Sequence, residues 1–165
     1  MIRELIRRDP SLRYSVSVTT RRPRRGEMEG TDYRFVDSES FDRAVRNGEF
    51  LEWARVHGCY YGTPREPVQR WLTEKRTVLF DLDVQGAQRL KTLFPEAVSV
   101  FLLPPDTRTL RQRLAERKTE SDGGLNALLL TAQAEIEMAE RYDYVLVNDC
   151  LDDTVASLRA IVDHP

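Results

Sequence analysis

The pattern of hydrophobic and polar positions changes character near residue 77. From there onward, apolar runs typical of buried strands alternate with segments of helical spacing, and that alternation is typical of a parallel sheet covered by helices. The expected strands are 77–83, 97–103 and 144–147, and the expected helices are 84–93, about 106–118, about 124–141 and one from about 152. The pattern therefore predicts an α/β fold.

The first part of the chain mixes shorter elements. A helix is expected at residues 2–8, ended before Asp9-Pro10 because proline disfavours helical geometry in the residue before it. Thr63 is a residue type that caps helices, and Pro64 suits the first helical position, so another helix is expected there. The remaining expectations are strands at 14–19, 33–36 and 49–56 and a helix at 38–47. Together these elements predict a small, mostly β insertion at about 33–66 within the α/β core.

Length and composition favour one soluble domain. The chain has 165 residues, of which 41% are hydrophobic, and no apolar run approaches the ~18 residues of a membrane span. We expect no membrane association. Cys59 and Cys150 lack the spacing of a metal site, and no secretory signal is recognised, so we expect reduced thiols, a cytoplasmic protein and no bound structural metal.

The overall charge argues against a general nucleic-acid binder. The net charge is −2, from 25 basic and 27 acidic residues, and nucleic-acid affinity usually depends on a wide positive field. An anion site on this chain is therefore expected to be local. A targeting or nucleic-acid patch at RRPRR, residues 21–25, is kept as a lesser alternative.

The segment from Tyr14 to Tyr33 reads YSVSVTTRRPRRGEMEGTDY and carries the residues that hold a phosphate. Arg21 and Arg24 each offer paired N–H donors to phosphate oxygens. Hydroxyl groups before and after them add neutral donors. The alternative for this segment alone is a solvated basic loop.

The same segment is followed in order by GEFLEWARVHGCYYGTP, VLFDLDVQGAQ, FLLPP and YDYVLVND. These motifs closely resemble the guanylate kinase family, over nearly the whole chain. The resemblance implies one domain, 1–165, whose core (1–32 and 67–165) is a P-loop kinase-like parallel sheet flanked by helices. It also implies a small mixed β/α lobe at about 33–66 that binds the monophosphate, and a lid at about 117–126. The family reaction converts ATP and GMP to ADP and GDP in purine nucleotide metabolism, with Mg-ATP as phosphoryl donor.

Glu52 is the candidate for reading the base. Guanine presents two adjacent donors that one carboxylate accepts side by side, and strand alternation places Glu52 on one face of FLEWARVH with Phe50 and Ala54. Adenine would turn a lone pair toward the carboxylate, and such mismatches allow strong discrimination. The alternative from the residues alone is a surface strand glutamate.

The resemblance implies the rest of a GMP site. Tyr61 has the alternative of a half-buried strand aromatic, and Thr63 that of a helix cap. Asp83 shares a strand face with Asp81 near the carboxyl end of a strand, where ligands collect in α/β sheets. The alternative for these two aspartates is a structural pair. The implied phosphate contacts are Arg21, Arg24, Tyr33 and Tyr61, and the implied base contacts are Ser17, Glu52, Thr63 and Asp83.

The ATP half of the site is expected to be incomplete. These residues contain no GxxxxGK[ST] phosphate loop, which the family would place, with the first core strand, before residue 1. In the lid, Arg117 is the tentative catalytic residue, but the arginine of the following helix falls on Leu128. Asn148 is the tentative contact on the adenine side. We therefore expect Mg-ATP not to bind this chain and the chain as given to be inactive.

Two functional hypotheses follow. The first is a guanylate kinase-family chain that binds GMP but does not transfer phosphate by itself. The second is a non-catalytic module that uses the same arginines and tyrosines to hold a phosphorylated peptide or partner protein. The sequence predicts nothing about the oligomeric state.

Overall fold

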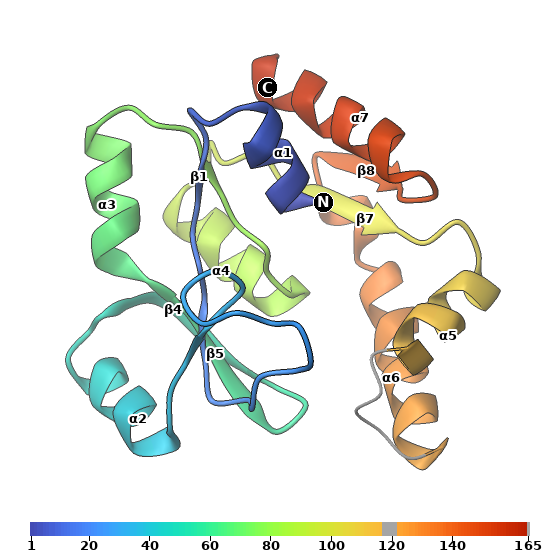
Figure 1. Cartoon of the computed structure of the whole chain (residues 1–165), viewed down its shortest axis with the longest axis horizontal. Helices are drawn as coiled ribbons and strands as arrows, with labels where there is room; N and C mark the ends of the chain where they lie inside the picture. The colour runs from blue at the N-terminus through green and yellow to red at the C-terminus, as the bar shows by residue number, and fades with distance from the viewer. Residues whose placement is uncertain (117–121, 165) are drawn as a thin grey trace. The chain divides into compact units, whose positions relative to one another are not determined.

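Each half of the chain folds as its own compact unit in the computed structural model: Ile2–Pro95 forms one, and Glu96–Pro165 with Met1 forms the other. The structure describes residues 1–116 and 122–164, with the backbone alone at 122–124. The α/β class predicted from the sequence is confirmed, because each unit contains a pair of parallel strands with helices beside it (Figure 1).

The described elements of the unit 2–95 are helices and strands, and its two longest strands lie near the middle of its sequence. In chain order they are α1 (Ile2–Arg8), β1 (Arg13–Tyr14), β2 (Val18–Thr19), β3 (Arg34–Phe35), α2 (Ser38–Arg46), β4 (Phe50–Val56), β5 (Cys59–Pro64), α3 (Arg65–Thr73), β6 (Val78–Leu79) and α4 (Val84–Leu93).

Four of these strands form one sheet, in the order β3-β2-β5-β4. The strands β4 and β5 make an antiparallel hairpin whose register pairs Glu52 with Thr63, after a bulge between Phe50 and Glu52. Its turn uses His57 and Gly58, both with positive φ. The hairpin therefore sets polar residues from two strands directly opposite each other.

Aromatic stacking holds α2 against this sheet. Phe41 of α2 is almost fully buried, and its ring stacks on Phe50 with the ring centroids 4.7 Å apart. The ring of Tyr60 also stacks on Phe41, with the ring centroids 5.5 Å apart. Val18 completes this cluster. Large buried aromatic surfaces of this kind dominate core energetics, so the hairpin is anchored close to its site residues.

The unit 96–165 repeats a strand-helix arrangement around its own parallel pair. Its described elements are β7 (Val100–Leu103), α5 (Thr107–Glu116), α6 (Asp122–Ile136), the short 3₁₀ helix η1 (Ala139–Arg141), β8 (Tyr144–Val147) and α7 (Leu151–Asp163). The strands β7 and β8 pair in parallel from Val100 with Tyr144 to Leu103 with Val147. Within the described residues, no helix is long and apolar enough to cross a membrane.

The structure corrects several expected boundaries. The single strand expected at 14–19 is two strands, because β1 pairs with β6 whereas β2 turns away to pair with β3 and β5. The strand expected at 77–83 is reduced to Val78–Leu79, and the helix expected at 124–141 spans Asp122–Ile136 and is followed by η1. The strand β5 was not predicted. By contrast, the helices expected at 2–8 and 84–93 and the strand at 144–147 are confirmed at those residues.

Candidate functional site

Arg21 is the centre of a packed cluster of polar and aromatic groups. Its Nη1 and Nη2 donate to the carboxylate of Glu27 at 3.0 and 2.8 Å, and its Nε donates to the hydroxyl of Tyr61 at 3.2 Å. The guanidinium also lies 5.2 Å from the ring centre of Tyr33. Only 12% of its side chain is exposed, so its direction is fixed by its neighbours.

Glu27 is a site residue that the sequence analysis missed. Besides Arg21, it accepts a hydrogen bond from the backbone N–H of Arg24 at 2.7 Å. Burial raises the pKa of Glu27, but the hydrogen bonds from Arg21 and from the Arg24 backbone outweigh it and lower the pKa below its usual range. The sequence signal for it is a carboxylate six residues after an arginine within a basic loop.

Arg24 differs from Arg21 in having donor capacity to spare. Its Nε is buried and has no hydrogen-bond partner among the described residues. Buried unpaired donors are uncommon and costly. The neighbours Arg22 and Arg25 are exposed. The basic loop is therefore not a uniform patch, because two of its arginines face inward and two face solvent.

Two tyrosines border this cluster. The rings of Tyr33 and Tyr61 meet edge to face, with centroids 6.0 Å apart. Burial, followed by the negative charge of Asp81, raises the pKa of Tyr33. Its hydroxyl therefore stays protonated at neutral pH and can donate to an anion. The structure thus brings Arg21, Tyr33 and Tyr61 into contact, and their binding of a phosphate stays a prediction.

Glu52 and Thr63 form the second part of the site. Glu52 is only 7% exposed, and its Oε1 accepts a hydrogen bond from the Thr63 hydroxyl at 2.5 Å. This bond corrects the expectation that Thr63 caps a helix. The helix α3 begins at Arg65, its N-cap is Pro64, and no side chain caps it. The hydroxyl of Thr63 is directed across the hairpin to the carboxylate instead.

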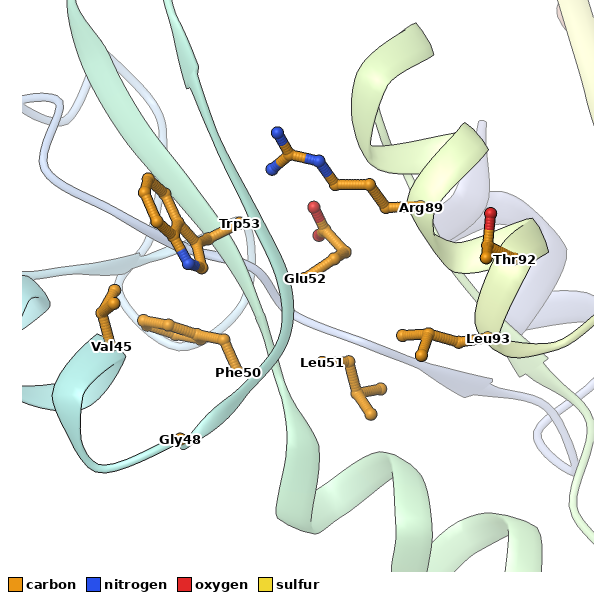
Figure 2. A pocket seen from close by; sticks show the side chains of 9 residues that line it. All are labelled: Val45, Gly48, Phe50, Leu51, Glu52, Trp53, Arg89, Thr92 and Leu93. Atoms are coloured by element: carbon orange, nitrogen blue, oxygen red, sulfur yellow. The ribbon is translucent and has the colours of Figure 1, made fainter.

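The electrostatic surroundings of Glu52 oppose its charge. Burial is the largest cause of a raised pKa, and the nearby Asp83 raises it further, whereas the Thr63 hydrogen bond and the charge of Arg89 lower it. Figure 2 shows Glu52 projecting from β4 toward α4, where the guanidinium of Arg89 extends over it. The carboxylate is therefore buried, polarised and available to a partner that donates hydrogen bonds.

A pocket of about 400 Å³ opens beside this carboxylate. Its lining combines Glu52, Arg89 and Thr92 as polar groups with apolar side chains from β4, α4 and the end of α2 (Figure 2). The apolar members are Val45, Phe50, Leu51, Trp53 and Leu93, and Gly48 completes the wall. Of the described residues predicted for the site, only Glu52 lines this pocket.

Asp83 and Ser17 take positions that the sequence alone did not define. Asp83 caps α4, with its Oδ1 accepting from the backbone N–H of Gly86 at 2.9 Å. Ser17 is buried directly before β2, and its carbonyl accepts from the Arg34 N–H at 2.9 Å. Their proposed contacts with a base stay predictions.

The other predicted residues belong to the unit 96–165. Asn148 follows β8, where its side-chain oxygen accepts from the Thr154 hydroxyl at 3.3 Å and its carbonyl accepts from Arg113 at 3.0 Å. Arg117 lies outside the described residues, as do residues 118–121 of the segment expected to form the lid, and residues 122–126 of that segment belong to α6. The role expected for each of them stays a prediction.

Comparisons with known proteins agree on one family. The guanylate kinase family model matches residues 1–165. The guanylate kinase of Myxococcus xanthus is 44% identical over 159 residues, covering 96% of this chain and 76% of that protein. The guanylate kinase of Symbiobacterium thermophilum is 46% identical over 160 residues, covering 97% and 76% respectively.

A solved structure agrees with this assignment. The crystal structure of guanylate kinase from Anaplasma phagocytophilum superimposes with a TM-score of 0.84 at 37% sequence identity, and the match covers 98% of this chain and 78% of that one. A nucleotide-binding α/β fold and a buried carboxylate beside an arginine-tyrosine cluster define the class. The chain belongs to the guanylate kinase family.

Proposed function

We propose that this chain binds GMP through the unit 2–95, as the acceptor site of the guanylate kinase reaction. The observation that carries the proposal is the buried carboxylate of Glu52, fixed by Thr63 at 2.5 Å and bordered by a pocket. A buried acceptor of this kind favours a ligand that presents two donors in one plane, as guanine does. Adenine would leave the carboxylate opposite a lone pair, at the cost of a buried, unpaired charge.

The phosphate of GMP is assigned to the arginine-tyrosine cluster. The free Nε of Arg24 and the hydroxyl groups of Tyr33 and Tyr61 supply donors. Arg21 already donates to Glu27 through both of its terminal nitrogens. Its Nη1 also donates to the carbonyl of Arg22 at 2.7 Å, and its Nε donates to Tyr61. Glu27 therefore orients Arg21, and the phosphate uses the remaining N–H of Nη2.

Transfer to GMP requires a donor, which in guanylate kinases is ATP with Mg²⁺. These 165 residues contain no GxxxxGK[ST] loop to hold its phosphates, and Leu128 stands where the family has an arginine in the helix after the lid. The residues present therefore lack the phosphate cradle that Mg-ATP requires. We propose that a polypeptide of these residues alone holds GMP without turnover.

Two residues of the unit 96–165 complete the proposal. Arg117 would contribute a positive charge from the lid to the transferring phosphate, and Asn148 would contact the adenine of ATP. Both roles are carried over from the family's motifs, and they apply only where a complete donor site is present.

A titration with a matched variant tests the proposed function. Calorimetry should show GMP binding to the chain, and Thr63→Val should weaken GMP binding by about 10–150-fold, since a hydrogen bond to a charged group contributes ~1.5–3 kcal/mol. The same protein incubated with ATP, Mg²⁺ and GMP should form no GDP. Absence of GMP binding would contradict the acceptor role, and GDP formation would contradict the proposed lack of turnover.

The arginine-tyrosine cluster also supports a second candidate function. Arg24 with its unpaired Nε would serve a phosphoserine as well as a nucleotide phosphate. In that case a phosphoserine peptide should bind with similar affinity to wild type and to Thr63→Val, because Thr63 and Glu52 would be irrelevant to it. Peptide binding without GMP binding would favour this candidate.

A further inference from the structure

The first turn of α4 lies unusually close to the two carboxylates of the site. Gly86 is the third residue of α4 and is buried. A Cβ atom at this position would stand 3.1 Å from Asp83 Oδ1 and 3.2 Å from Glu52 Oε2. Contacts this short are rare for real Cβ atoms, so a side chain at residue 86 would require both carboxylates to shift by a few tenths of an ångström.

The backbone itself does not require glycine here. Gly86 is not among the glycines with positive φ, which are Gly26, Gly30, Gly48 and Gly58. In a helix, glycine is about 1 kcal/mol less favourable than alanine. The glycine at this position therefore costs helix stability, and the space it leaves is filled by the oxygens of Glu52 and Asp83.

We propose that Gly86 is a positioning residue for guanine recognition. Its missing side chain lets Glu52 Oε2 and Asp83 Oδ1 lie against the N-terminal turn of α4, where the backbone N–H of Gly86 holds Asp83 at 2.9 Å. Thr63 thus fixes one oxygen of the Glu52 carboxylate, and the other oxygen lies against the first turn of α4. The positive end of the α4 dipole then stands beside two negative charges. This inference rests on the proposed reading of guanine by Glu52.

The variant Gly86→Ala distinguishes the effect of the close carboxylate contacts from the effect of helix propensity, because only the contacts should change GMP affinity. Propensity alone would stabilise the protein and leave binding unchanged. Displacement of the carboxylates should instead lower GMP affinity on the order of tenfold, while AMP affinity changes by less than about twofold. Gln88→Ala, at an exposed position of the same helix, should leave GMP affinity unchanged. Wild-type GMP affinity in Gly86→Ala would overturn the proposal, as would an equal loss for GMP and AMP.

A second measurement needs no nucleotide. If residue 86 acts on Glu52, the effect of Gly86→Ala on melting temperature should be more favourable in a Glu52→Ala background than in wild type, because one of the two close contacts is then gone. Equal changes in melting temperature in both backgrounds would contradict the proposed contact between residue 86 and Glu52. Should the wild-type chain bind GMP and AMP equally, the proposed function fails, and this thermal comparison still decides whether Gly86 makes room for Glu52.

Discussion

At the scale of single residues, burial divides four neighbouring arginines of equal charge. Arg21 is held by Glu27 and Tyr61, and Arg24 keeps a buried, unpaired Nε, whereas Arg22 and Arg25 are exposed. A planar guanidinium matches a phosphate in a way that a lysine ammonium does not. The loop therefore offers a direct test of geometry against charge.

Lysine substitutions keep the positive charge but remove the planar guanidinium with its paired N–H donors. We expect Arg21→Lys and Arg24→Lys to weaken GMP binding by about tenfold or more, because a lysine cannot make the two-point pairing by which Glu27 orients Arg21, nor supply the free N–H of Arg24. Arg22→Lys and Arg25→Lys are the matched controls and should bind GMP as wild type does in calorimetry. If all four variants behaved alike, the loop would be acting as a charge patch, as the nucleic-acid alternative requires.

The pKa of Glu52 links recognition to stability. Burial and Asp83 raise it above its value in the unfolded chain, against Thr63 and Arg89. The folded form therefore prefers the protonated carboxyl, and this contribution is fully present below the ordinary pKa of 4.5 and is lost as pH rises through the raised value.

Glu52→Gln should remove the loss of stability that wild type suffers as the pH rises through the raised pKa of Glu52. Without ligand, its melting temperature should exceed that of wild type at neutral pH, and the difference should shrink as the pH is lowered toward about 4. Thermal melts across this range measure it. A variant less stable than wild type at neutral pH would show that Glu52 is held by more favourable contacts than its surroundings indicate.

At the scale of elements, the β4–β5 hairpin positions the site and depends on a close approach. A Cβ atom on Gly62 would lie 2.9 Å from the ring of Phe50, which stacks on Phe41 in the core. Gly62 stands between Tyr61 and Thr63, which contribute to the two halves of the site. The packing of this hairpin and the spacing of the site are therefore coupled.

Gly62→Ala should disturb that coupling. We expect a loss of about 1–3 kcal/mol in the free energy of unfolding, the usual cost of forcing extra volume into a packed core. Urea denaturation measures the loss, and GMP affinity should fall with it as Tyr61 and Thr63 shift. An unchanged unfolding midpoint would mean that the Phe50 ring moves aside freely.

The elements that sequence could predict are those whose pattern is local. The helices α1 and α4 have apolar spacing and end signals within their own residues, and both were located correctly. The strand β5 contains Gly62 and Pro64, which weaken a strand signal, and it is defined by pairing with β2 and β4. The separation of β1 from β2 likewise depends on partners distant in the chain.

The same distinction applies to the site. Motifs in order along the chain are enough to nominate Arg21, Tyr33, Glu52, Tyr61 and Thr63, whose roles stay predictions. The partners of these residues were not found. Glu27 holds Arg21, Thr63 bonds Glu52 across 11 residues of a hairpin, and Gly86 leaves room for two carboxylates. Each depends on a direction that a side chain takes only after the strands have paired.

At the scale of the whole molecule, all the groups assigned to GMP lie in the unit 2–95, and the groups expected to meet ATP lie in the unit 96–165. Among the groups assigned to GMP, Thr63 is hydrogen-bonded to Glu52 and Arg21 to Tyr61, whereas the Nε of Arg24 has no partner among the described residues. The family assignment covers the full chain. The central claim is that this acceptor site distinguishes guanine from adenine through Glu52.

The most direct test is the ratio of GMP to AMP affinity, measured by calorimetry for wild type and Glu52→Gln. The account predicts that wild type binds GMP at least about 100-fold more tightly than AMP, and that Glu52→Gln reduces this ratio to within about tenfold. Equal affinities of wild type for GMP and AMP, or an unchanged ratio in Glu52→Gln, would contradict it.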